Sequence, residues 1–160
     1  MNTKIFFTTN AGLYFYSETA EILVDGIHNA GSAGFSPMTD ERRRQMESRQ
    51  GFFTGAGALL FTHLHRDHYD DAAVRAYLSR HPETALWGPE LRCKGFTDVE
   101  SVGPECRFTY GDFNIIAYKT KHSGSSALNV PHYSLLLCRK SAGETFFVAG
   151  DAVLEPELAD

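Results

Sequence analysis

Ligand-type side chains gather in the segment 61–70, Phe-Thr-His-Leu-His-Arg-Asp-His-Tyr-Asp. The segment begins at the end of the apolar run 58–61, which predicts a buried strand, so the polar cluster is expected on the loop at the carboxyl end of that strand. In extended backbone alternate side chains share a face, so His63 and His65 can present their imidazoles to one metal ion. Asp67 and His68 follow where the chain must turn, and they could face a second ion beside the first.

The mixture of imidazole and carboxylate limits the choice of metal. It suits zinc, iron or manganese without selecting among them. The competing interpretation is a surface loop that happens to be rich in histidine, because a single histidine is more often structural than a ligand. Four ligand-type residues in the pattern H-x-H-x-D-H favour the metal site. We therefore expect one or two divalent metal ions, with zinc as the first expectation and iron or manganese as alternatives.

This pattern resembles that of the metallo-β-lactamase superfamily, whose members carry H-x-H-x-D-H after a strand of the first half-domain. His122 looks like the next histidine of the family, and Asp151, which follows an apolar segment and a glycine, looks like its metal-bridging aspartate. The segment 22–26 looks like the strand and turn that precede the motif. The resemblance implies an α/β fold, an αββα sandwich of mixed sheets with helices outside.

The resemblance also implies the role of each ligand. The first ion would be held by three histidines: His63, His65 and His122. Asp67 and His68 would hold the second ion, and Asp151 would bridge the two. Asp67 would in addition orient the attacking water as a base.

The sequence departs from the family after Asp151. The family usually has a further histidine for the second metal there, whereas residues 152–160 contain none. We therefore expect residues 1–160 to form a single domain that is incomplete at its C-terminus, with an exposed apolar sheet face and an unpaired edge. The second ion should bind more weakly than the first, so that the chain holds fewer than two equivalents of metal and has poor or no activity.

Strands and helices are predicted around the motif from residue patterns. The predicted strands are 4–9, 13–17, 21–25, 58–61, 84–87, 98–102, 107–110, 113–119, 132–139 and 144–149. The first three should form one antiparallel edge of a sheet. Helices are predicted at about 39–50 and at 72–80, with a helical turn at 89–94. The first helix carries three consecutive arginines, Arg42, Arg43 and Arg44, which are expected to face solvent or, alternatively, to form a phosphate-binding edge of the cleft.

Three further histidines lie outside the motif, and two of them have two interpretations each. His28 lies in the glycine-rich loop 26–37, where a structural hydrogen-bonding role is expected, although the loop should open on the side of the metal cleft. His81 is expected at a solvent-facing helix end. His132 precedes a strand and is expected to be structural, with a place in the cleft as the alternative.

Composition narrows the function classes further. The 160 residues are 42% hydrophobic and 22% charged, which is ordinary for one globular domain. The net charge of −5 argues against a nucleic-acid partner. No apolar stretch approaches the roughly 20 residues that cross a membrane. Three cysteines without a C-x-x-C motif, and an N-terminus without the layout of a signal peptide, favour a cytoplasmic location.

A metal-dependent hydrolase is the expected function. The resemblance implies a metal-activated water acting on an ester, lactone or phosphodiester, and the spacing is similar to the lactonase and RNase Z-like branch. The expected partner is a small substrate, preferably anionic, and self-association of the chain stays open. One alternative is a mononuclear iron oxidoreductase of the same fold. Members of the family that reduce oxygen with two irons place a glutamate where His65 stands, so His65 argues against that two-iron branch. The other alternative is a binding module without catalytic activity.

Overall fold

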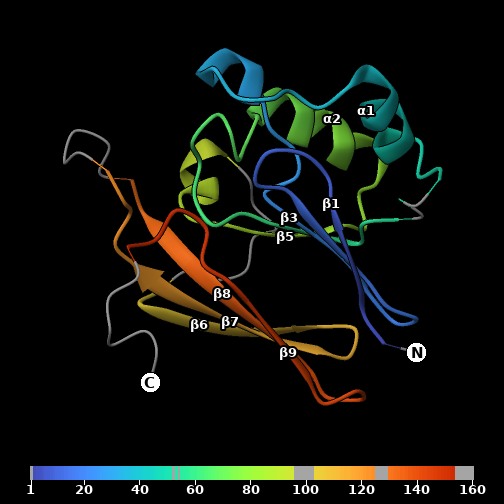
Figure 1. Cartoon of the computed structure of the whole chain (residues 1–160), viewed down its shortest axis with the longest axis vertical. Helices are drawn as coiled ribbons and strands as arrows, with labels where there is room; N and C mark the ends of the chain where they lie inside the picture. Colours follow the sequence, from blue (N-terminus) through green and yellow to red (C-terminus); the bar gives the residue numbers. More distant parts are fainter. Residues whose placement is uncertain (1, 52, 54, 96–102, 125–129, 154–160) are drawn as a thin grey trace.

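The computed structural model describes residues 2–51, 53, 55–95, 103–124 and 130–153. Two β-sheets face each other, and both helices lie on the outer side of the first sheet (Figure 1). The first sheet has five strands in the order β1 (Lys4–Phe7), β2 (Leu13–Tyr16), β3 (Glu21–Val24), β4 (Ala58–Leu60) and β5 (Ala85–Trp87). The second has four strands in the order β6 (Glu105–Tyr110), β7 (Phe113–Thr120), β8 (His132–Arg139) and β9 (Glu144–Val148).

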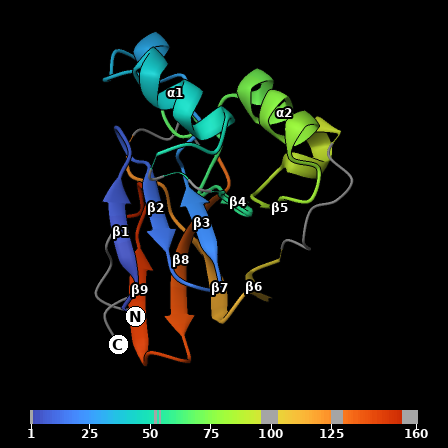
Figure 2. The same ribbon diagram turned by 90° about the vertical axis from the view of Figure 1, so that its right-hand side faces the viewer.

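The connections explain why the helices share one side of the molecule. Strands β1, β2 and β3 form the predicted antiparallel edge, whereas β3, β4 and β5 are parallel. Parallel neighbours need a crossover, and the two crossovers contain α1 (Asp40–Glu47) and α2 (Asp71–Arg80). The second sheet is an antiparallel meander and needs no crossover helix. Figure 2 shows the two helices above the ends of both stacked sheets.

The alternation of side chains along the strands gives the first sheet two buried faces. Leu23 and Leu59 pack in one core beneath the helices, together with Val74 and Tyr77 of α2. A second core lies between the two sheets and includes Ile22, Val24, Leu60, Phe113, Ile115, Leu135 and Leu137. Each fully buried side chain of this size contributes about 1.5–3 kcal/mol to folding. The two cores together fix the ends of the strands from which the candidate site is built.

The outer face of the second sheet carries an apolar row and lies away from the helices (Figure 1). Ile116, Leu136 and Phe147 are register partners across β7, β8 and β9, and Phe147 is 48% exposed. Within the described residues no helix covers this face (Figure 1). The described part of the chain also has no helix that is both long and apolar enough to pass through a membrane.

Most of the predicted elements lie where they were expected. Thr39 caps α1 by accepting a hydrogen bond from the Arg42 amide at 3.2 Å, and Asp70 caps α2 by accepting one from the Ala73 amide at 2.8 Å. The predicted helical turn is the short 3₁₀ helix η2 (Leu91–Lys94), and the loop 26–37 contains an additional one, η1 (Ala30–Ala33). The predicted strand 98–102 lies outside the described residues.

Two surface predictions need correction. His81 lies at the end of α2 as predicted, but it is only partly exposed, because its Nε2 lies 3.0 Å from the Glu47 carbonyl oxygen and its ring centroid lies 4.7 Å from that of Tyr77. Arg42 is half-buried, and its guanidinium donates to the carbonyl oxygens of Phe7, at 3.1 Å, and Thr8. Arg43 and Arg44 are exposed as predicted. Arg42 therefore attaches α1 to the end of β1, which a charge pattern alone does not reveal.

We expect the three arginines of α1 to differ in their effect on stability. Arg42→Ala should lower the free energy of unfolding by about 1.5–3 kcal/mol, the usual contribution of hydrogen bonds to a charged group. Arg43→Ala and Arg44→Ala should each change it by less than about 0.5 kcal/mol, because both side chains are exposed. Urea denaturation followed by circular dichroism measures the difference. Equal effects of the three substitutions would show that the Arg42 contacts do not contribute.

Candidate metal centre

The six predicted ligands converge at one end of the two stacked sheets. Four of them lie on the loop that follows β4, as predicted: His63, His65, Asp67 and His68. His122 follows β7, and Asp151 follows β9. A single-residue bridge joins His122 to Ala152, with hydrogen bonds from the Ser123 amide to the Asp151 carbonyl at 2.7 Å and from the Val153 amide to the Lys121 carbonyl at 2.8 Å. The second sheet therefore brings two ligands that are distant in sequence to the loop of the first.

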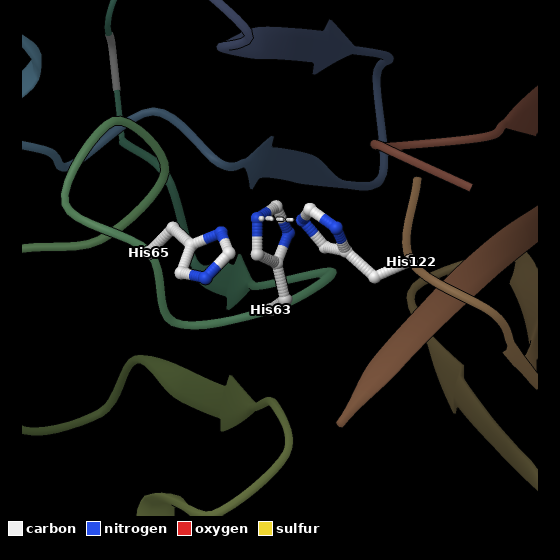
Figure 3. A group of neighbouring side chains, drawn as sticks. All are labelled: His63, His65 and His122. Atoms are coloured by element: carbon white, nitrogen blue, oxygen red, sulfur yellow. Dashed lines mark hydrogen bonds between the residues drawn. The ribbon is translucent and has the colours of Figure 1, made fainter. Parts of the chain in front are cut away.

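Three histidines form a first group that could hold one ion. His63, His65 and His122 each present a ring nitrogen, and these atoms lie within 4.8 Å of one another. His63 lies between the other two rings (Figure 3), and its Nε2 is 3.3 Å from Nε2 of His122. Ligand atoms of a tetrahedral zinc site with Zn–N of about 2.0–2.1 Å lie roughly 3.3–3.4 Å apart. The His63–His122 separation therefore fits two ligands of one ion.

A second group shares His63 with the first. It contains His63, His68 and Asp151, whose ligand atoms also lie within 4.8 Å of one another. Nε2 of His68 is 3.5 Å from Oδ1 of Asp151 and 3.6 Å from Oδ2 of Asp67. Oδ2 of Asp151 faces the first group instead, at 3.8 Å from Nε2 of His122 and 4.0 Å from Nε2 of His63. The Asp151 carboxylate thus presents one oxygen to each group.

Burial and neighbouring charges give these histidines different protonation states. Desolvation, reinforced by the nearby His68 and His132, lowers the pKa of His63 to about 2. Desolvation and His122 also lower the pKa of His65. Burial alone would lower the pKa of His68, but hydrogen bonds to Asp151 and Asp25 outweigh it and raise the pKa to about 10. His63 and His65 therefore offer free lone pairs at neutral pH, whereas His68 must lose a proton to bind a metal ion.

Asp25 is the residue of the site that sequence reasoning missed. It is 1% exposed, lies at the end of β3, and has a φ of +49°, in the left-handed region that Asp tolerates better than most residues. Its carboxylate accepts hydrogen bonds from the Thr62 amide at 2.8 Å, the Thr62 hydroxyl at 2.6 Å and Nδ1 of His68 at 2.9 Å. Because Nδ1 of His68 donates to Asp25, Nε2 is the atom directed at the cluster. The available signal was an aspartate between a buried strand and Gly26.

The other two buried histidines are hydrogen-bonded, as predicted. Nδ1 of His28 accepts from the Ala30 amide at 3.2 Å, and Nε2 lies 3.3 Å from the Thr9 carbonyl oxygen. His28 is outside both ligand groups. His132 is 1% exposed, and its Nε2 accepts from the Asp151 amide at 2.9 Å. Its ring centroid is 5.0 Å from that of His63, so this structural histidine directly adjoins the cluster.

The donor chemistry of the cluster fits a divalent metal ion. The first group consists of three imidazoles, the second of two imidazoles and a carboxylate, and neither contains a thiolate, which is the set expected for zinc, iron or manganese. Because the pKa values of His63 and His65 are lowered, both rings are neutral near pH 7 and can offer a nitrogen lone pair to a cation. The cluster could therefore hold a metal.

Solved structures identify the fold. A protein of Parabacteroides distasonis assigned as a metal-dependent hydrolase superposes with a TM-score of 0.66 at 19% identity, covering 98% of this chain and 64% of its own. The diiron β-hydroxylase CmlA of Streptomyces venezuelae gives 0.65 at 17% identity, covering 98% and 31%. The metallo-β-lactamase fold protein YhfI of Bacillus subtilis gives 0.51 at 18% identity, covering 87% and 53%. No family model and no curated protein sequence matches.

The chain therefore has the metallo-β-lactamase fold, as the motif predicted. It spans about two thirds of the P. distasonis protein and about one third of CmlA. At these identities the likeness defines the fold, and it leaves the reaction to be argued from the site.

Proposed function

We propose that this chain binds one or two divalent metal ions, zinc in the first place, and hydrolyses a small ester, lactone or phosphodiester. The observation that carries the proposal is the convergence of five imidazole and carboxylate side chains in two groups that share His63, with Asp67 beside them at 3.6 Å from His68. The fold of the P. distasonis protein, which is assigned as a metal-dependent hydrolase, supports the same class of reaction.

In this proposal each side chain has a distinct part. The three histidines of the first group would hold one ion, and Asp67 and His68 would hold the other, with Asp151 between them. Bound divalent ions would supply Lewis acidity and water that ionises near neutral pH. Asp67 is half-buried beside His68, which suits a base that orients the attacking water and takes its proton. Asp25 would keep Nε2 of His68 turned toward the cluster.

The expected partner remains a small substrate and not a nucleic acid, since the net charge of the chain is −5. An anionic group on the substrate is our preference. A reducing, cytoplasmic environment is proposed from cysteine usage, and the described Cys106 and Cys138 are free thiols.

Metal-dependent turnover tests the proposal. The purified chain is treated with a chelator, reloaded with zinc, manganese or ferrous iron, and assayed with p-nitrophenyl acetate, a γ-lactone and bis(p-nitrophenyl) phosphate. Slow hydrolysis of at least one substrate should disappear with the chelator and return with the metal. Asp67→Ala should lower the rate by about 10²–10⁴-fold, the usual contribution of a positioned base. Hydrolysis that is indifferent to both the chelator and this substitution would contradict the proposal.

Iron-dependent oxygenation is the second candidate, favoured by the similarity in fold to the diiron hydroxylase CmlA. An oxygen electrode distinguishes it from hydrolysis. The iron-loaded chain with a reductant should consume no more oxygen than the same solution containing the His63→Ala variant. Uptake that requires His63 would favour the oxidoreductase over the hydrolase.

A further inference from the structure

A chain of polar side chains runs from the second sheet to the backbone of Asp151. His132 at the start of β8 faces Thr120 at the end of β7 as its register partner. Nδ1 of His132 is 2.8 Å from the Thr120 hydroxyl, which is 3.2 Å from the Ser134 hydroxyl. Ser134 in turn donates to the Ala149 carbonyl at 2.9 Å. The proposed mechanism uses none of these three side chains.

The donor and the acceptor of each hydrogen bond among these three side chains can be assigned in one way only. The Asp151 amide can only donate, so Nε2 of His132 must accept and carries no proton. Neutral histidine then carries its proton on Nδ1 and donates it to Thr120. The Thr120 hydroxyl is left to donate to Ser134, and the Ser134 hydroxyl to the Ala149 carbonyl. Every hydrogen bond in the chain is satisfied in this arrangement.

These hydrogen-bonded side chains hold a backbone turn at Gly150. Gly150 lies between the two peptide groups that they bind, the Ala149 carbonyl and the Asp151 amide, and has a φ of +60°. A Cβ atom there would lie 2.7 Å from Nε2 of His132 and 2.9 Å from Thr62, so the turn packs directly on these side chains. The Asp151 carbonyl accepts from the Ser123 amide at 2.7 Å. Both polar backbone groups of Asp151 are therefore fixed, one by His132 and one by the loop of His122.

We propose that His132 is a positioning residue, which fixes the Asp151 carboxylate between the two ligand groups by accepting the hydrogen bond of the Asp151 amide. The inference rests on the proposed metal site. His132 itself does not bind the ion, because its Nε2 is used by the amide and its Nδ1 by Thr120. Losing this hydrogen bond frees the carboxylate to turn away, and the ion of the second group is affected most, because the first group keeps its three histidines.

Two substitutions of His132 separate positioning from packing. In His132→Gln the side-chain Oε1 can take the place of Nε2 and accept from the Asp151 amide. In His132→Asn the shorter side chain can reach Thr120 but leaves the amide without its partner. Cobalt(II) is the probe, titrated into the chelator-treated chain and followed through its visible absorption bands, while urea denaturation gives the stability of each metal-free variant.

The Asn variant should bind the second cobalt ion about 10–100-fold more weakly than the unmodified chain, which is the range found for outer partners of metal ligands. Its affinity for the first cobalt ion should stay within about 3-fold of that of the unmodified chain. The Gln variant should restore the second affinity to within about 3-fold. Equal cobalt binding by all three proteins would overturn the role of His132 and leave the metal site intact. Equal weakening at both sites in both variants would overturn it in favour of a general packing role. Absence of cobalt binding by the unmodified chain would overturn the metal site, and the positioning role with it.

Thr120→Val provides a second test if the Asn variant does not fold. Valine keeps the shape of threonine but removes the hydroxyl that receives the Nδ1 proton, so the His132 ring is held less firmly against the Asp151 amide. The second cobalt ion should bind more weakly by about 10-fold. Unchanged binding would overturn the proposal, because Thr120 is the side chain that orients the His132 ring toward the amide. Ser141→Ala, which removes another hydroxyl of the second sheet far from the cluster, is the matched control and should bind both ions normally.

Discussion

The chain with His63→Ala is expected to lose nearly all bound metal, whereas His65→Ala should lose only the ion of the first group. His63 is fully buried and is the one residue that belongs to both groups identified among the described residues. Loss of an outer partner alone weakens metal binding by 10–100-fold, so the loss of a direct ligand should weaken the first ion by more than about 100-fold. The second ion should be weakened as well, because the His63 ring packs against that of His68 with 4.0 Å between the ring centroids. Metal counting by atomic emission after gel filtration measures the effect.

His81→Ala is the matched control for this prediction. His81 is half-buried and hydrogen-bonded, but its partner is the carbonyl of Glu47 at the end of α1, and His81 lies outside both groups. The variant should keep the metal content of the unmodified chain. Equal metal content in the His63 and His81 variants, with normal circular dichroism for both, would refute the assignment of His63.

Local sequence signals were sufficient for the motif and for the strands that present it. The run that begins at Ala58 is apolar at every position, which predicts a strand buried on both faces. The polar residues directly after it can lie only on the following loop. Strand β8 has the predicted bounds of His132–Arg139, because its aromatic and leucine residues end at a turn sequence. Helix caps at Thr39 and Asp70 are equally local, since the capped amides lie three residues further on.

The supporting residues could not be predicted, because they depend on pairing between distant strands. The parallel register of β3 and β4 pairs Val24 with Leu60, which brings Asp25 beside Thr62 and so beside His68. The register of β7 and β8 likewise pairs Thr120 with His132. A one-residue slip of either pair would turn these side chains to the opposite face. Sequence order alone gives no measure of register between strands separated by a long crossover.

The metal-free chain is expected to be most stable near pH 6.5 and to lose stability on both sides. The folded-state pKa of His68 is about 10, above the unfolded value of 6.5, so its stabilisation is complete below pH 6.5 and is lost as the pH rises toward 10. The pKa values of His63 and His132 are lowered to about 2 and about 4, chiefly by burial. The unfolded chain therefore binds more protons than the folded chain between these values and 6.5, and stability falls as the pH drops through that window.

Asp25→Asn should remove much of the decrease in the free energy of unfolding that the unmodified chain shows between pH 6.5 and 10. Asparagine tolerates the positive φ at this position and keeps the shape of the side chain, but it removes the charge that helps to hold the proton of His68. The variant should be less stable than the unmodified chain at pH 6.5 by a few kcal/mol, since a buried charge pair has lost one partner, and the gap should narrow by pH 10. Urea denaturation in the presence of a chelator, at intervals from pH 5 to 10, gives both curves.

Asp112→Asn is the control, because it also removes one carboxylate but at a site hydrogen-bonded to Arg139. The pKa of Asp112 is lowered to about 2: burial acts to raise it, and hydrogen bonds from Ser141, Thr19 and Arg139 outweigh that effect. Its stabilisation is therefore present above pH 3.8 and constant across the alkaline window. Asp112→Asn should lower the whole curve without changing its slope above pH 6.5. The same slope in the unmodified chain and in both variants would mean that His68 does not hold its proton through Asp25.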